Sequence, residues 1–479
     1  MERQAHAVRV GDRTARTRIR GGLELIGDAL RGRGASPTEG PVFTAILLLA
    51  IPMVLEMVME SVFAVVDIFF VSRLGAEAVA AVGLTESLMT VVYTVAMGLS
   101  IGVSATVSRR VGEHRPEDAA VATAQGMLLG GAIALALGVV GAWQAPALLR
   151  LMGATDPVVA VGSGYARVLL ATNGVIVFLF VLNAAFRGAG DAAIAMRVLW
   201  LANILNLVLD PLLIFGLGPF PELGVTGAAV ATSIGRGTAV SVQLVTLFGV
   251  SDRLRVTWAH LVPQIDVMKR LVRLSASGTF QIFIGTASWI GLVRVLASFG
   301  PEAVAGYTVA IRVVLFALLP AWGLSNAAAT MVGQNLGAGL IDRAEASVWR
   351  ACWMNVAFLG VFGLLFLVGA PGIVGLFGVD GLTARYAEHG LRIVSAGFLF
   401  YGFGMTLTQA FNGAGDTWTP TWLNLACFWL WEIPLAWMLA FPLGLGAEGV
   451  FIAIAVAYAT LAVASALVFR KGRWKTVTV

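Results

Sequence analysis

The segment Ala185-Phe-Arg-Gly-Ala-Gly-Asp191 reveals the architecture of the chain, because it occurs a second time with one residue changed. The second copy lies 225 positions further on, as Ala410-Phe-Asn-Gly-Ala-Gly-Asp416. Three more pairs share this offset: Leu74-Gly-Ala-Glu-Ala-Val-Ala80 with Phe299-Gly-Pro-Glu-Ala-Val-Ala305, Gly98-Leu-Ser100 with Gly323-Leu-Ser325, and Gly224-Val225 with Gly449-Val450. The sequence therefore predicts two copies of one structural unit.

The composition identifies the environment of the two units. Of 479 residues, 58% are hydrophobic and 12% are charged, and the mean hydropathy is +0.87. A soluble domain carries about 25% charged residues, so an ordinary soluble enzyme is excluded. Apolar runs recur from Val42 to Phe469, and each is long enough to cross ~30 Å of hydrocarbon as a helix. The chain is predicted to be a membrane protein.

Twelve apolar runs are present, and we expect an all-α integral membrane protein with twelve spanning helices. Barrel strands would alternate polar and apolar residues, which these runs do not. Each repeat holds six helices, so both copies start on the same side of the membrane and form two pseudo-symmetric bundles, V-shaped around a central cavity. The expected spans are residues 43–72, 78–107, 121–143, 158–184, 191–216, 224–249, 274–298, 303–333, 348–370, 386–411, 417–440 and 446–469.

The distribution of Lys and Arg predicts the orientation. Most basic loop residues fall on one side, together with eight arginines in the first 40 residues, and basic loops stay in the cytoplasm. Both termini are therefore expected in the cytoplasm, with the protein in the inner (plasma) membrane. The predicted parts are a cytoplasmic Arg-rich segment (1–41), an N-lobe (42–249), a cytoplasmic linker (250–273), a C-lobe (274–469) and a cytoplasmic tail (470–479).

The sequence contains no motif of an enzyme or an ATP-driven pump. A nucleophile elbow, a phosphate loop and paired metal-ligand spacing are all absent from it. Cys352 and Cys427 lie in apolar stretches, and the four histidines fall in polar segments without metal-binding spacing. The net charge of +5 is spread over helix ends and indicates no nucleic-acid role. We expect no enzyme activity, no cofactor and no dedicated metal centre.

A set of motifs, ordered along residues 42 to 470, resembles one transporter family. The motifs are Pro52, Val66-Asp67, Phe70-Val71-x-Arg73-Leu-Gly75, Gly98-Leu-Ser-Ile-Gly102, Arg187-Gly-Ala-Gly-Asp191, Asn206-x-x-x-Asp210-Pro211, Gly227-Ala-Ala-Val-Ala-Thr232 and Gly333-Gln-Asn-Leu-Gly337. They are similar to those of multidrug and toxic compound extrusion (MATE) transporters. The resemblance implies cation-coupled export of organic, often cationic or amphiphilic, compounds by two lobes that open alternately. It is closer to a DinF-like prokaryotic branch than to the NorM-like branch, whose acids in helices 7 and 10 are missing here except for Glu388.

The repeat shows which polar residues the scaffold can do without. Adding 225 converts Asp67 to Leu292, Asn206 to Trp431, Asp210 to Leu435, Thr232 to Ala457 and Glu60 to Gly285. A charge near the bilayer centre costs at least ~2.5–3.5 kcal/mol, so acids confined to one lobe are expected to have a function there. At ~1.5 Å per residue, Asp67, Asp210 and Thr232 all lie about 9–12 Å below the outer boundary.

These residues are the predicted ion-coupling site. Asn206 and Asp210 are four residues apart and share a helix face. The resemblance implies that Asp67, Asn206, Asp210 and Thr232 form the cation site of the N-lobe. Either H⁺ on a carboxylate or Na⁺ among these oxygens fits the residue types. For Asp210, which precedes Pro211, an interfacial helix cap is the alternative.

Two further residues are candidates for the central cavity. Glu60 belongs with Glu56 and Asp67 to an acidic stripe on one helix face, which is expected to face the cavity rather than lipid. Asn183 is the second candidate. The alternatives are ion pairs of Glu56 and Glu60 with Arg197 or Arg236, and a structural hydrogen bond of Asn183.

The second lobe carries three charges without charged counterparts in the first: Arg294, Arg312 and Glu432. A structural ion pair involving Glu432 is expected, and a second coupling or substrate-orienting site is the alternative. A flippase of a lipid-linked precursor, from the related superfamily, is the alternative function. It would favour a basic cavity for a diphosphate, and Arg294 and Arg312 keep this possibility open.

The expected function is therefore a secondary active multidrug exporter. Its partners are expected to be small organic cations or amphiphiles and membrane lipid, with no nucleic acid, and it is expected to work as a monomer.

Overall fold

The computed structural model describes residues 21–33, 36–250 and 253–479, and every regular element in these ranges is a helix. The N-lobe comprises α2 (Val42–Val71), α3 (Ala76–Gly112), α4 (Pro116–Leu151), α5 (Asp156–Ala171), α6 (Asn173–Gly188), α7 (Ala192–Phe215) and α8 (Val225–Val245). The C-lobe comprises α9 (Ile265–Leu296), α10 (Pro301–Gly337), α11 (Ile341–Gly375), α12 (Gly381–Ala396), α13 (Phe398–Ala414), α14 (Trp418–Asn424), α15 (Ile433–Ala440) and α16 (Gly446–Arg470). The all-α prediction is confirmed.

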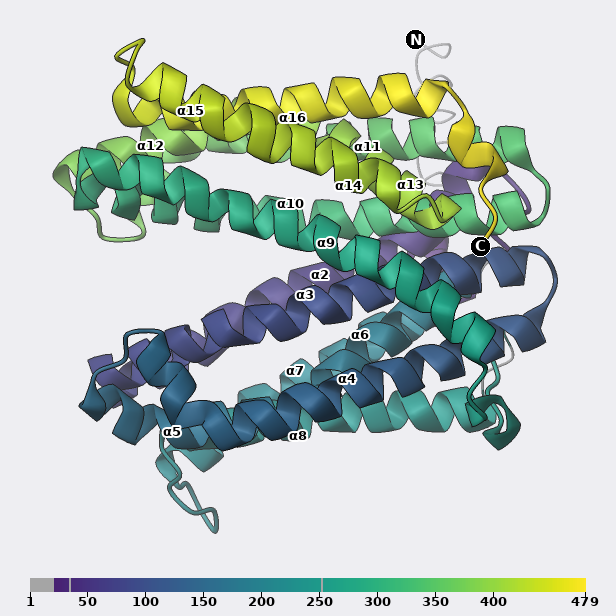
Figure 1. The fold of residues 1–479 in the computed structure, drawn as a ribbon, viewed down its shortest axis with the longest axis horizontal. Coiled ribbons are helices and arrows are strands. Elements are labelled where there is room, and N and C mark those ends of the chain that lie inside the picture. Colours follow the sequence, from purple (N-terminus) through teal and green to yellow (C-terminus); the bar gives the residue numbers. More distant parts are fainter. Residues whose placement is uncertain (1–20, 34–35, 251–252) are drawn as a thin grey trace, which may run out of the picture.

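Two of the expected spans are broken helices. α5 and α6 meet at an angle of 42°, and α12 and α13, their counterparts in the repeat, meet at 57°. Within the described residues, nine helices are long and apolar enough to cross a membrane, and the two bent pairs raise this to eleven. α8 lies alongside α7 and supplies the twelfth helix of the two six-helix bundles (Figure 1). The sequence did not predict the breaks, because the apolar composition continues through both bends.

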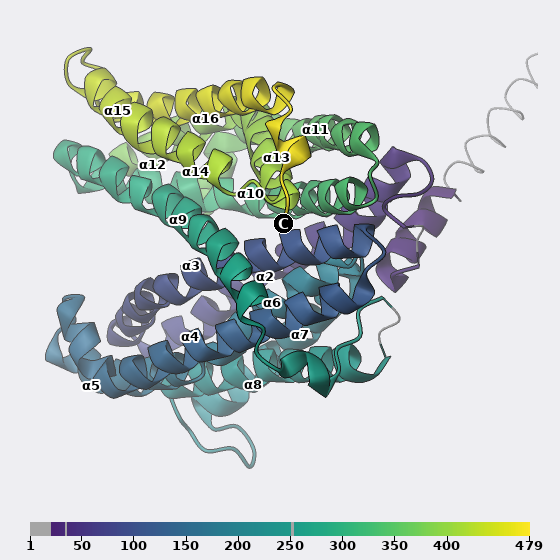
Figure 2. The same ribbon diagram turned by 45° about the vertical axis from the view of Figure 1, so that its right-hand side comes forward.

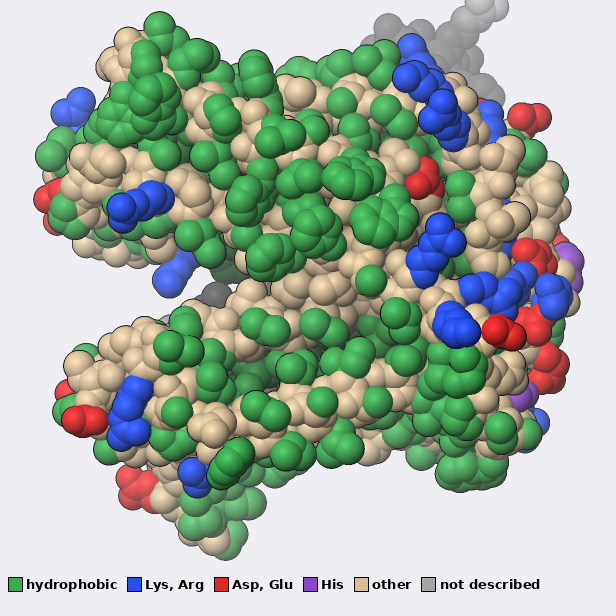
Figure 3. Space-filling model, in the orientation of Figure 1, with side chains coloured by type: hydrophobic (Ala, Val, Ile, Leu, Met, Phe, Trp, Pro, Cys, Tyr) green, Lys and Arg blue, Asp and Glu red, His purple; other side chains and the backbone are tan. Residues whose placement is uncertain are grey.

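The two lobes form a V. They separate toward one end of the molecule and meet at the other, which we call the open end and the closed end (Figures 1 and 3). Hydrophobic side chains cover much of the outer surface of both lobes, as expected for contact with lipid (Figure 3). α2 and α9, which are equivalent in the repeat, both cross the junction: α2 packs on α10 of the C-lobe and α9 packs on α3 of the N-lobe (Figure 2).

The repeated Gly-Leu-Ser motif makes these crossings possible. A Cβ atom at Gly98 in α3 would lie 2.5 Å from the backbone nitrogen of Thr279 in α9. A Cβ atom at Gly323 in α10 would lie 2.5 Å from the backbone oxygen of Met53 in α2. Only glycine allows the helix backbones to approach this closely. The motif therefore recurs because each lobe receives one helix that crosses from the other lobe.

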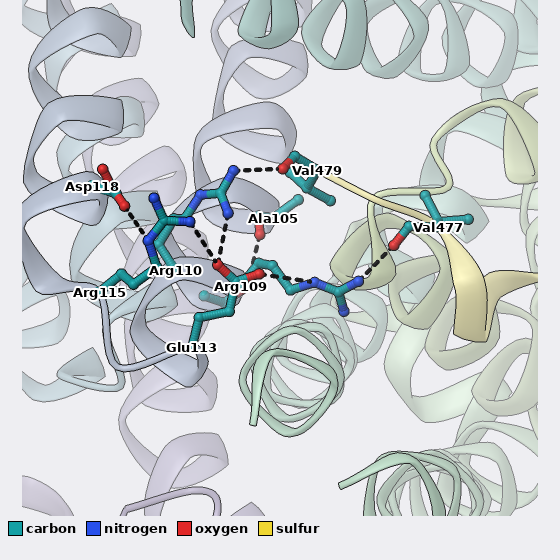
Figure 4. A network of polar contacts seen from close by, with 9 residues as sticks. Ala105, Arg109, Arg110, Glu113, Arg115, Asp118, Val477 and Val479 are labelled. Carbon is teal, nitrogen blue, oxygen red and sulfur yellow. Dashed lines mark hydrogen bonds and ion pairs between the residues drawn. The ribbon is translucent and has the colours of Figure 1, made fainter. Parts of the chain in front are cut away.

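Arginine side chains close the narrow end of the V. Arg109 donates to the backbone oxygen of Val477 at 2.5 Å, and Arg110 donates to that of Val479 at 2.7 Å (Figure 4). Arg343 donates to the backbone oxygen of Pro37 at 3.1 Å. The segment after α16 is thereby attached to the N-lobe, and the segment before α2 is attached to the C-lobe. Both attachments stabilise contact between the lobes at the closed end.

Replacing Gly112 with valine is expected to weaken this closure. A Cβ atom there would clash with the backbone oxygen of Gln334 in the opposite lobe. Spin labels on the α3–α4 and α10–α11 turns should therefore report a larger population with the closed end open. Gly237→Val is the matched control, because no atom lies within 4 Å of a Cβ at Gly237. An unchanged distance distribution in Gly112→Val would contradict a tight lobe contact at this point.

Candidate functional site: ion-coupling residues and central cavity

The structure brings three of the predicted coupling residues together between α7 and α8. The Asn206 side-chain amide donates to Oδ1 of Asp210 at 3.1 Å and lies 3.3 Å from the Thr232 hydroxyl oxygen. Asn206 and Asp210 are both fully buried. One turn of α7 thus presents the carboxylate and the amide on one face, as their spacing predicted, and α8 supplies the hydroxyl.

The side chain of the fourth residue, Asp67, lies outside the described residues, but its helix is placed. Trp200 of α7 donates to the backbone oxygen of Leu55, 145 positions earlier, and Asn203 donates to that of Met59, 144 positions earlier. α2 and α7 therefore run parallel in a defined register. Extended along both helices, this register places residues 65–66 level with Asp210, so position 67 of α2 is within one helical turn of that level.

Below this site, an ion pair joins α2 to α8. Glu60 accepts a hydrogen bond of 3.0 Å from Arg236, which also donates to the Tyr93 hydroxyl at 3.2 Å. The guanidinium carbon of Arg236 lies 4.7 Å from the centroid of the Phe63 ring. The structure therefore gives Glu60 the ion-pair partner that the sequence offered as its alternative to a cavity role. The side chain of Glu60 remains 32% exposed.

A second buried ion pair lies nearer the closed end. Glu56 is 1% exposed and accepts hydrogen bonds of 3.0 Å from both Arg187 and Asn183. The Asn183 carbonyl oxygen in turn accepts a 2.5 Å hydrogen bond from Gln243. Asn183 is therefore buried within this network. Of the two arginines considered for the acidic stripe, Arg197 pairs with neither acid in the described structure; Glu56 is paired with Arg187 instead.

The central cavity lies between the lobes, and Arg187 of the second ion pair forms part of its wall. It has a volume of about 140 Å³. Arg187 is the only charged residue in its described lining, which both lobes otherwise supply with apolar groups such as Met57 and Trp322 and with amides such as Asn326 and Gln409. Glu60 and Asn183, the predicted cavity residues, do not line it. The network of Glu56 and Asn183 thus reaches the cavity only through Arg187.

The repeat comparison could have identified residues that our sequence reasoning overlooked. Arg187 becomes Asn412 after adding 225, Arg236 becomes Leu461, Gln243 becomes Val468 and Tyr93 becomes Leu318. The second lobe thus lacks every charged member of the network, acids and arginines alike. The sequence interpretation offered Arg197 and Arg236 as partners for Glu56 and Glu60 and did not compare Arg187 with its repeat counterpart, so it missed Arg187 as the partner of Glu56.

The C-lobe contradicts one prediction. Glu432 is 2% exposed and forms no ion pair with any described residue, so the expected structural ion pair is wrong. Arg294 and Arg312 are exposed, while Glu432 faces the interior of the lobe. Within the described part of the chain, no group of three or more His, Cys, Asp or Glu side chains could hold a metal ion.

The family model MatE matches residues 52–212 and again residues 280–438, once in each lobe. The chain belongs to the MatE family. As a member of this family it is a multi-pass membrane transporter rather than an enzyme, and it handles small organic substrates. The resemblance to MATE transporters and the two-lobe, twelve-helix architecture are confirmed, while the DinF-like branch stays a prediction.

Known proteins similar to this MatE transporter cover nearly its whole length. The probable multidrug resistance protein YoeA of Bacillus subtilis is 26% identical over 87% of this chain and 91% of its own length. A protein of Shewanella oneidensis named FAD transporter is 26% identical over 83% of this chain and 88% of its own length. A solved outward-facing conformation of a multidrug resistance MATE family transporter is 27% identical, with a TM-score of 0.86, covering 92% of this chain and 98% of that one.

Proposed function

We propose that this protein is a multidrug efflux transporter that exports organic cationic or amphiphilic compounds in exchange for H⁺ or Na⁺ bound in the N-lobe. The observation that carries the proposal is the buried cluster of Asp210, Asn206 and Thr232, which the C-lobe scaffold replaces with apolar side chains. A buried acid is costly in a membrane, so a cluster present in one lobe alone supports a coupling role. The relatives named as multidrug resistance proteins support export of drug-like compounds.

The proposed mechanism uses helix α2, which packs on α7 beside this cluster and carries Met57 of the cavity wall. An ion entering from the open end would bind at Asp67 and Asp210 and alter the packing of α2 against α7 and α8. α2 also carries Glu56, whose partner Arg187 lines the cavity. Movement of α2 would therefore change the cavity wall and release the substrate, which is alternating access driven by ion binding.

The proposed orientation places the closed end in the cytoplasm. The arginines at the closed end, Arg109, Arg110 and Arg343 among them, support this assignment because basic residues stay on the cytoplasmic side. The conformation described here would then be outward-open, in the inner membrane, with both termini cytoplasmic. We further propose that the protein works as a monomer surrounded by lipid.

Reconstitution in vesicles tests the function. Purified protein should export ethidium when a proton or sodium gradient is imposed, and the dye flux should be accompanied by movement of the driving ion in the opposite direction. Failure of both gradients to drive export of ethidium or of an anionic dye of similar size would contradict the proposal. Movement of a fluorescent lipid-linked diphosphate in the same vesicles would instead indicate the flippase alternative.

Thr232→Ala is expected to separate the two coupling ions. The hydroxyl is an oxygen ligand that Na⁺ would use, whereas a proton on Asp210 does not need it. Under proton coupling the variant should keep export within about twofold of the unmodified protein. Under sodium coupling, loss of this ligand should raise the sodium concentration for half-maximal export about tenfold, which corresponds to ~1.4 kcal/mol of sodium-binding free energy. The alanine is compatible with the scaffold, because Ala457 occupies the equivalent position. Equal losses under both gradients would contradict a ligand role for this hydroxyl.

A further inference from the structure

Glu432 is a buried acid that forms no ion pair with any residue that the structure describes. Its side chain is 2% exposed, and its Oε2 atom has no hydrogen-bond partner among the described residues. The two arginines that the sequence places within spans of the same lobe, Arg294 and Arg312, are exposed and form no ion pair with it. An unpaired carboxylate in such a place costs several kcal/mol in lost hydration, whereas the neutral carboxyl does not. The environment of Glu432 therefore suits a group that carries a proton.

The titratable groups facing Glu432 are hydroxyls and a thiol. Tyr307 of α10, Tyr401 of α13 and Tyr458 of α16 lie within electrostatic range of its carboxyl group, as does Cys427. The rings of Tyr401 and Tyr458 are stacked with centroids 3.6 Å apart, and the buried Tyr307 hydroxyl has no hydrogen-bond partner in the described part of the chain. Tyrosine and cysteine side chains are uncharged near neutral pH, so none of these neighbours can balance a carboxylate.

The repeat relates this acid to the N-lobe cluster. The position equivalent to Asp210 is Leu435, and Glu432 lies one helical turn before it. The position equivalent to Thr232 is Ala457, and Tyr458 is the next residue. An acid and a hydroxyl therefore lie between the same two helices of each lobe. A comparison of single positions across the repeat does not show this relation, because the acid is displaced by one turn and the hydroxyl by one residue.

A π-helical segment accounts for the burial of Glu432. Its equivalent in the N-lobe, Leu207, lies in the α-helix α7 and is 48% exposed, whereas Glu432 is 2% exposed. The offset of 225 is the same before and after this segment, at Asp191 and Asp416 and at Gly224 and Gly449, so the two lobes have the same length between these points. Residues Leu425–Glu432 form a π-helix between α14 and α15, and its wider turns rotate the side chains within it, Glu432 included, relative to an α-helix. Such segments are rare and are frequent at functional sites.

We propose that Glu432 is a proton-binding site of the C-lobe, whose carboxylate takes up a proton to become a neutral carboxyl and releases it during the transport cycle. Proton binding follows from the burial, the uncharged surroundings and the π-helical register. Its use in transport rests on the proposed cation-coupled export. The proposal names H⁺ because a protonated carboxyl needs no further ligand, whereas a metal cation would need several oxygen ligands arranged around it.

Labelling of the wild-type protein tests proton binding directly. Dicyclohexylcarbodiimide reacts with protonated carboxyls in apolar surroundings, and mass spectrometry of the peptide that contains Glu432 measures the extent of reaction. Labelling should be high in acidic buffer and fall about tenfold for each pH unit above the midpoint, since the protonated fraction does so. Labelling that stays constant from acidic to alkaline buffer would overturn the proposal, because a permanently neutral carboxyl cannot take up and release a proton.

Infrared difference spectra between acidic and alkaline buffer provide a second measurement. The protonated-carboxyl band should be reduced in Glu432→Gln and retained in the control Glu448→Gln, a glutamate that is 46% exposed and pairs with His389. The band and the labelling should both persist in Asp210→Asn even when that variant no longer exports ethidium, so failure of the N-lobe proposal is distinguishable. Absence of Glu432 labelling together with an unchanged band in Glu432→Gln would overturn the C-lobe site.

Discussion

Asp210→Asn is expected to reduce gradient-driven export of ethidium to the level of protein-free vesicles. The substitution keeps the size of a fully buried side chain and its hydrogen bond with Asn206. It removes the only carboxylate of the described cluster, the group that can bind a proton or carry a negative charge. An ion can drive transport only if it binds one conformation more tightly than another. Without the carboxylate, the ion no longer binds one conformation of the N-lobe more tightly than another, so the gradient cannot drive transport there.

Export by the variants should be compared in vesicles with equal amounts of inserted protein. Asp67→Asn is expected to give the same loss, because position 67 lies close to the level of Asp210 on the neighbouring helix. Asp156→Asn is the matched control: this aspartate is 90% exposed at the start of α5, and export should be unchanged. Full activity in Asp210→Asn would show that coupling takes place elsewhere in the molecule.

Arg187→Met is expected to lower the free energy of unfolding by about 3–5 kcal/mol, because it leaves the buried Glu56 without its ion-pair partner. Adding Glu56→Gln should restore most of this loss, since the remaining amide can be buried without a charge. Glutamine is compatible with the scaffold, because Gln281 occupies the equivalent position of the C-lobe. Unfolding in detergent, followed by tryptophan fluorescence, measures both variants.

The control for this experiment is Arg150→Met. Arg150 is 59% exposed and lies 3.7 Å from Asp156, so its loss should cost no more than about 1 kcal/mol. Equal destabilisation by Arg187→Met alone and by the double variant would show that Glu56 does not depend on Arg187 for its burial. The double variant also tests transport: restored stability without restored export would indicate that the ion pair itself is used in the cycle.

The sequence was sufficient to predict the features that depend on a single segment or on the internal repeat. Long apolar runs identified membrane helices, because any chain must satisfy its backbone hydrogen bonds internally in lipid. The offset of 225 residues gave the two lobes, and the four-residue spacing of Asn206 and Asp210 placed their side chains on one helix face. In each case the deciding interaction lies within one element or between two copies of the same segment.

The packing of the helices determines which charged groups form ion pairs and which are buried without one among the described residues. Glu56 and Arg187 are 131 positions apart and Glu60 and Arg236 are 176 apart, so these pairs depend on how α2 packs against α6 and α8. Glu432 is buried without an ion-pair partner among the described residues because it lies in a π-helical segment. The constant offset of 225 residues gives no sign of this segment. Apolar periodicity specifies that a segment is a helix and how long it is, but the rotation of that helix about its axis is determined by close packing with its neighbours.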